Sequence, residues 1–215
     1  MATYSGQRIA DSGLIFALDA GNTKSYPGSG STWFDIAGTA NASLGNAVSY
    51  SSSNGGILNF NGTSNGLAVV PSSSFDLRST NHTVITATRY TGAGPNGRIV
   101  TSNANNWLIG NWSAQVNKYY AEGWVSNSSG DTADTSWFIW AATGNIGTDT
   151  WELYRNGSII YSNNGGFAGP HGISAGGNSG ELSASQVGFI LAYNRVLTST
   201  EISEIYYIYR NRYGI

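Results

Sequence analysis

The last quarter of the chain constrains the fold most, because it combines a tight hairpin with a long strand. Residues 151–161, WELYRNGSIIY, alternate apolar and polar positions around Asn156-Gly157. This pair readily takes the positive φ angles that a two-residue hairpin turn requires. The apolar segment at residues 186–196 then predicts one further strand. The segment therefore predicts a hairpin followed by one long strand.

A single helix is predicted after that strand. Thr198 and Glu201 have the spacing of a capping box, in which each residue bonds the backbone N–H of the other. This motif places the helix at about residues 199–211. Apolar side chains then recur at the spacing of one helix face, at Ile202, Ile205, Tyr206 and Tyr209. We expect this stripe to pack on a sheet of the same chain.

The rest of the chain reads as short strands separated by Gly, Asn and Ser clusters. The expected strands cover residues 14–18, 47–50, 56–60, 66–70, 83–90, 98–101, 107–112, 118–125 and 136–143. In the last of these, Trp137 and Ile139 share one face while Phe138 and Trp140 share the other. Bulky residues on both faces predict a central strand with both sides covered. The predicted fold class is all-β with one C-terminal helix.

Composition agrees with a β protein that is rich in turns. The 215 residues include 29 glycines, and only 10% are charged against a typical value of about 25%. Aromatic residues make up 13%, and they fit pleated strands well. We expect one domain over residues 13–215, preceded by an irregular arm at residues 1–12.

Charge and cysteine content exclude several functions. The formal net charge is −2, and the basic residues are scattered, so we expect no nucleic-acid binding. No apolar stretch is long enough to predict a membrane span or a secretory signal, and we expect the chain to be made and kept in the cytoplasm. The absence of cysteine excludes disulfides, zinc–thiolate sites and thiol catalysis.

The C-terminal segment also carries a family resemblance. Its hairpin and the residues that follow resemble the last strands of concanavalin A-like lectin/glucanase (laminin-G-like) jelly rolls, through Tyr193, Asn194, Arg195, Leu197, Thr198, Glu201 and Ile202. Residues 13–38 and 55–71 are similar to the opening strands of versions found in tailed-phage virion proteins, including those of marine phages. The resemblance covers nearly the whole chain and implies a sandwich of two antiparallel sheets.

Three functions are compatible with this resemblance. The first is a virion structural protein, assembled in the host cytoplasm as a head decoration or surface knob, or as a tail-fibre tip, with weak glycan adhesion. Its partners would be capsid or tail proteins and further copies of itself, and Tyr4, Arg8 and Ile9 of the arm are the predicted attachment residues. The second is a lectin-like module of a bacterial or phage adhesin, and the third is a glycoside hydrolase. The resemblance favours the first.

Hydrolysis is disfavoured by the pattern of carboxylates. Glycosidases need two carboxylates that flank the scissile bond. The nearest pattern is Asp149-x-x-Glu152, in which Asp149 falls in a turn. We therefore predict that the chain is not an enzyme. His82 and His171 lack the partners of a catalytic relay, and we expect both to be surface or turn residues.

Two ligand sites remain as predictions. Sugar rings pack on aromatic faces while amides bond their hydroxyls, which points to Asn103, Asn105, Asn106, Trp107, Trp112 and Trp124. The alternative is that these three tryptophans lie in the core or between subunits. Asp131 and Asp134 crowd oxygen ligands into one loop and could hold Ca²⁺, although two carboxylates on a loop of this kind more often simply solvate it. We expect no other cofactor.

Overall fold

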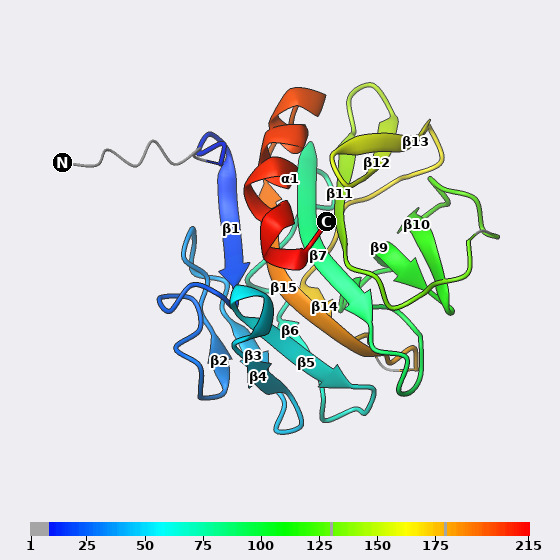
Figure 1. Cartoon of the computed structure of the whole chain (residues 1–215). Helices are drawn as coiled ribbons and strands as arrows, with labels where there is room; N and C mark the ends of the chain where they lie inside the picture. Colours follow the sequence, from blue (N-terminus) through cyan, green and yellow to red (C-terminus); the bar gives the residue numbers. More distant parts are fainter. Residues whose placement is uncertain (1–8, 130, 179) are drawn as a thin grey trace.

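Two antiparallel sheets and one C-terminal helix make up the structure. It is a computed structural model that describes residues 9–129, 131–178 and 180–215 (Figure 1). The sheets enclose one large apolar cluster, and the helix α1 (Ser199–Tyr213) lies across the larger sheet. The predicted all-β fold class is confirmed. No helix within the described residues has the length and apolarity that a membrane crossing would need.

The larger sheet has eight strands in the order β13-β12-β11-β7-β15-β5-β4, with β1 also paired to β15. Its strands are β1 (Leu14–Asp19), β4 (Ser49–Ser51), β5 (Ile57–Asn61), β7 (His82–Tyr90), β11 (Phe138–Asn145), β12 (Thr150–Arg155), β13 (Ser158–Asn163) and β15 (Ala184–Tyr193).

The smaller sheet has seven strands in the order β10-β9-β8-β14-β6-β3-β2. Its strands are β2 (Thr32–Trp33), β3 (Ala42–Leu44), β6 (Ala68–Val70), β8 (Val100–Thr101), β9 (Trp107–Trp112), β10 (Gln115–Ala121) and β14 (Ile173–Ala175). A short 3-10 helix, η1 (Ser53–Gly55), precedes β5.

Aromatic side chains from both sheets fill the space between them. The Trp107 and Tyr119 rings, from the smaller sheet, lie 6.0 Å apart at near right angles. Tyr119 in turn contacts Trp151 of the larger sheet, with ring centroids 6.4 Å apart. All three side chains are buried, so each removes a large apolar area from water. These contacts hold the two sheets together at one end of the sandwich.

The strand β11 is covered on both faces, as its sequence predicts. Trp140 belongs to the cluster between the sheets, whereas Ile139 belongs to a second cluster beneath α1. Trp137, just before the strand, stacks on Tyr213 of the helix with centroids 4.6 Å apart. β11 lies inside the larger sheet between β7 and β12. The prediction of a central strand is confirmed.

The C-terminal helix begins at the predicted capping box. The Thr198 side chain accepts a bond from the Glu201 N–H, and the Glu201 carboxylate accepts one from the Thr198 N–H at 2.8 Å. Arg195 adds an ion pair to Glu201 at 2.5 Å. This arginine holds the pKa of the Glu201 carboxyl at about 2. The helix start is thereby fixed to the end of β15.

Local turns agree with the sequence, and several strand ends differ from it. Asn156 and Gly157 both take positive φ, 50° and 79°, as the hairpin between β12 and β13 requires. The expected strand at residues 118–125 instead ends at Ala121, because Glu122 turns the chain with φ of 58°. Short strands such as β2 and β14 carry too few residues to show a period.

The expectation that both histidines are surface or turn residues is wrong for His82. Its side chain is completely buried against Trp151, with ring centroids 5.7 Å apart. Nδ1 donates to the Thr80 carbonyl at 2.7 Å, while Nε2 has no partner among the described residues. Burial lowers the pKa of His82 to about 4. The first residue of a strand can thus face the core, which periodicity alone does not reveal.

His82 predicts a loss of stability in mild acid. The unfolded chain takes up a proton near the ordinary histidine pKa of about 6.5, whereas the folded chain resists it until about pH 4. Stability should therefore fall as pH drops through this window, by about 2 kcal/mol between about pH 7 and pH 5. Urea unfolding at each pH measures this. The His82→Leu variant should lose most of the dependence, and His171→Asn should keep it; equal slopes in all three proteins would contradict the assignment.

The helix should contribute strongly to stability through Ile205. This side chain is 1% exposed, within the cluster beneath α1. Ile205→Ala should cost about 2–5 kcal/mol, the usual range for truncating a buried aliphatic side chain. Tyr207→Ala, on the exposed face of the same helix, is the control and should cost far less. Equal free energies of unfolding for the two variants would show that the helix does not support the fold.

Candidate functional site

A polar pocket lies where the loop before β15 crosses the segment before β8. The backbone of this loop pairs with the segment before β8: the Gly97 N–H donates to Leu182 O at 2.9 Å, and the Arg98 N–H donates to Glu181 O at 3.1 Å. A Cβ at position 97 would lie 2.4 Å from the Glu181 carbonyl group, so only glycine permits this approach. The crossing places Arg98 and Glu181 side by side.

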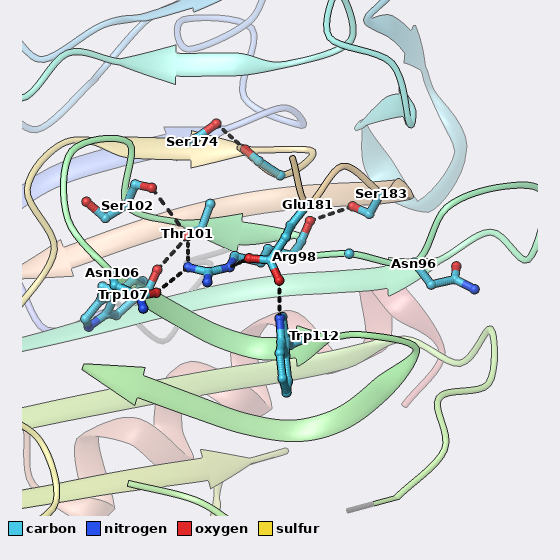
Figure 2. Close-up of polar contacts among 12 residues, drawn as sticks. Asn96, Arg98, Thr101, Ser102, Asn106, Trp107, Trp112, Ser174, Glu181 and Ser183 are labelled. Carbon is cyan, nitrogen blue, oxygen red and sulfur yellow. Dashed lines mark hydrogen bonds and ion pairs between the residues drawn. The ribbon is translucent and has the colours of Figure 1, made fainter. Parts of the chain in front are cut away.

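Arg98 is held by three partners (Figure 2). Its Nε donates to Glu181 Oε2 at 2.5 Å, and Nη1 donates to Asn106 Oδ1 at 2.8 Å. Nη1 also reaches Thr101 Oγ1 at 3.4 Å. The Arg98 side chain is 11% exposed, against 37% for Glu181. The Arg98 guanidinium is therefore held in place at the buried side of the pocket, and the Glu181 carboxylate is its more exposed partner.

The other Glu181 oxygen binds an indole. Trp112 Nε1, at the end of β9, donates to Glu181 Oε1 at 2.5 Å, and Figure 2 shows the carboxylate between Arg98 and Trp112. The Trp112 ring continues into an aromatic row, with Trp124 at 5.2 Å and Tyr120 a further 5.1 Å from Trp124. All three rings are half-buried. The row lies beside the pocket and joins it through Trp112.

The three predicted asparagines lie together on the loop between β8 and β9. Asn105 is half-buried and binds the loop before β14, donating to Gly169 O at 3.0 Å and accepting from the His171 N–H at 2.9 Å. Asn103 and Asn106 are exposed. Asn105 therefore shapes the loop, while its two neighbours present amides to solvent.

The pocket has a volume of about 340 Å³ and is lined by residues 103–106, Arg98, Asn178 and Glu181. A second pocket of about 610 Å³ also has Glu181 in its wall, together with Gly97, Ser113 and Ala114. We call them the arginine pocket and the glycine pocket. Glu181 is the residue that they share.

The structure brings together most of the predicted sugar-binding residues, with one exception. Trp107 is completely buried between the sheets, so it belongs to the core, which is the alternative considered for the tryptophans. Trp112 and Trp124 reach the surface. Arg98, Asn178 and Glu181 were not predicted, because Arg98 and Glu181 are 83 residues apart and no local pattern links them.

The predicted calcium residues do not converge. The Asp131 carboxylate accepts a bond from the Asn117 amide, and Asp134 accepts one from the Ser136 N–H at 2.7 Å. Across the described residues, no group of three or more acidic, histidine or cysteine side chains could hold a metal ion. Calcium binding at this loop stays a prediction.

The predicted attachment arm is described only in part. Tyr4 and Arg8 lie outside the described residues. Ile9 is partly buried and packs against the cluster beneath α1. Its apolar side chain therefore has a contact within this chain.

Comparison with known proteins identifies the fold. No family model and no curated protein matches the sequence. The Trypanosoma rangeli sialidase bound to the inhibitor DANA is 16% identical with a TM-score of 0.66, over 96% of this chain and 34% of that one. The binding domain of Paraclostridial Mosquitocidal Protein 1 is 16% identical with a TM-score of 0.67, over 94% and 55%. The Botulinum Neurotoxin Type G receptor binding domain is 17% identical with a TM-score of 0.61, over 92% and 51%.

These likenesses confirm the β-sandwich fold. The chain spans about a third of the sialidase and about half of the two toxin domains, and identities this low show the fold alone. The sialidase matches contradict the prediction that the chain is not an enzyme, and that prediction is withdrawn. None of the similar structures named here is described as a phage protein, and the virion assignment has no support from them.

Proposed function

We propose that this chain is a carbohydrate-binding, lectin-like module and that the arginine pocket holds the sugar. The observation that carries the proposal is the cluster of fixed polar side chains beside Trp112. Asn106 and Glu181 are both bonded to the Arg98 guanidinium, and Glu181 is also bonded to the indole. Few polar groups, each held in place, beside an apolar surface are typical of small-ligand pockets.

The polar groups suit sugar hydroxyls, which donate and accept at once. Amides such as Asn103 and Asn106 offer both a carbonyl acceptor and an NH₂ donor. Because Arg98 already holds the Asn106 carbonyl, that amide is oriented before a ligand arrives. Preorganised partners lose little conformational entropy on binding, which favours affinity.

The aromatic row supplies the apolar part of the site. Sugar rings have apolar faces of C–H groups, and these pack on aromatic rings. Trp112 donates its indole N–H to Glu181 at the side of the pocket, and its ring is followed by those of Trp124 and Tyr120. Lys118 lies behind the row, with its ammonium 6.0 Å from the Trp124 ring centroid. A bound glycan could therefore contact both amides and rings.

The comparisons agree with this proposal at the level of the fold. Two of the similar structures are described as binding domains, and one of the sialidase structures holds sialic acid. These structural similarities are compatible with a lectin-like module of a bacterial or phage adhesin. A place on a phage virion, with capsid or tail proteins as partners, remains a separate prediction that the neighbouring genes would test.

Glycan binding should depend on Asn106 and Trp112. The Asn106→Ala variant removes a positioned amide, and Trp112→Ala removes the aromatic ring that is bonded to Glu181. Each should raise the Kd for a bound glycan by roughly five- to 150-fold, because losing a positioned contact in such a site costs about 1–3 kcal/mol. A glycan array identifies the ligand, and isothermal titration calorimetry measures the Kd.

Asn211→Ala, at an exposed position on α1, is the matched control and should bind as the unmodified protein does. Circular dichroism checks that each variant is folded. The proposal fails if the unmodified protein binds no glycan above background, or if both pocket variants bind as tightly as the control.

A further inference from the structure

We infer that the ligand is a neutral oligosaccharide, not an anionic sugar, and that its chain passes over Glu181 from the arginine pocket into the glycine pocket. This inference rests on the proposed function and adds the charge and the length of the ligand. It is carried by the pairing of Arg98 with Glu181 and by the position of Glu181 between two pockets.

The charges at the site cancel. Among the described residues that line the two pockets, Arg98 and Glu181 are the only charged side chains, and their nitrogen and oxygen lie 2.5 Å apart. An anionic sugar would have to share the guanidinium with a carboxylate that is already bonded to it. The carboxylate of such a sugar would then lie beside the carboxylate of Glu181. The repulsion between these two negative charges acts against an anionic ligand.

Glu181 cannot easily move aside for a competing anion. One of its oxygens accepts from Arg98 and the other accepts from Trp112 Nε1, both at 2.5 Å. Its departure would leave a partly buried arginine and an indole N–H without this partner, which is costly. Glu122 adds a further negative charge nearby, because it accepts the Asn106 N–H at 2.8 Å. The pocket therefore selects against anions.

Two other basic residues near the site, Lys118 and Arg89, do not add positive charge to the pockets. Lys118 is 1% exposed and donates to the Asn127 carbonyl at 3.0 Å, so its charge is held behind Trp124 and away from the pocket surface. Arg89 bonds Gln186 on the larger sheet at 2.6 Å. Neither residue lines either pocket.

The two pockets lie on opposite sides of the ion pair. Figure 2 shows Asn106, in the arginine pocket, and Asn96, in the glycine pocket, on either side of Arg98 and Glu181. Their volumes, about 340 and 610 Å³, each fall within the usual range of small-ligand pockets, about 300–1,000 Å³. A single sugar would fill only one of them. An oligosaccharide that occupies both pockets would pass over Glu181, whose carboxylate would accept hydrogen bonds from the sugar hydroxyls.

The charge of the ligand is tested with Glu181→Gln, which keeps the size of the side chain and an acceptor for Trp112 but removes the negative charge. The probes are an array of neutral oligosaccharides of glucose, galactose and mannose, with sialylated and uronic-acid derivatives of the same chains. The unmodified protein should bind neutral chains at least tenfold more tightly than their anionic derivatives. Glu181→Gln should reduce that preference at least tenfold, because the Arg98 charge is then uncompensated.

The outcomes separate this inference from the proposed function. Binding of anionic chains by the unmodified protein as tightly as neutral ones overturns the inference while the proposed function stands. An unchanged preference in Glu181→Gln also overturns it. If neither protein binds any glycan, both the proposed function and the inference fail.

The length of the ligand is tested with Ser113→Tyr, which places a ring in the glycine pocket. It should weaken binding of a tetrasaccharide at least tenfold and leave binding of the corresponding monosaccharide unchanged. Ser158→Tyr, at an exposed position on β13, is the matched control and should alter neither. If Ser113→Tyr binds the tetrasaccharide as tightly as the control does, the chain does not enter the glycine pocket.

Discussion

The larger sheet is apolar on both faces, and the rest of the fold follows from the need to cover both. β7, β11 and β15 carry buried residues at nearly every position. One face is covered by the smaller sheet and the other by α1. Loss of either cover would expose a large apolar surface to water.

The end of the helix is fixed as firmly as its start. Arg212 pairs with Asp19 at 2.6 Å and donates to the carbonyls of Asn54 and Gly56 at 2.8 and 2.6 Å. These bonds join α1 to β1 and to the segment before β5, across more than 150 residues of sequence. Since one arginine satisfies three acceptors, the helix has one orientation on the sheet.

The candidate site lies beside β8 and β9, two inner strands of the smaller sheet. Arg98 comes from the segment before β8, Trp112 from the end of β9, and Glu181 from the loop before β15. Each element contributes one member of a bonded set, so their relative positions are set by sheet pairing and by the close approach at Gly97. Such a scaffold supports many functions. The chemistry of the site, not the fold, therefore carries the proposal of glycan binding.

Local features of this protein could be predicted from the sequence, because they depend on residues close together in the chain. The turn at Asn156-Gly157, the capping box at Thr198 and the two-faced strand at β11 are of this kind. The alternation of β9 also puts Trp107 and Trp112 on opposite faces of a strand. Which of those faces is buried was decided only by the second sheet.

The burial of His82 and the pairing of Arg98 with Glu181 depend on contacts across the sandwich, and no short-range pattern encodes them. The sequence by itself therefore determined the all-β class, the hairpin and the capped helix. The tertiary structure decided which polar residues meet at the pocket, because long-range packing alone brings them together.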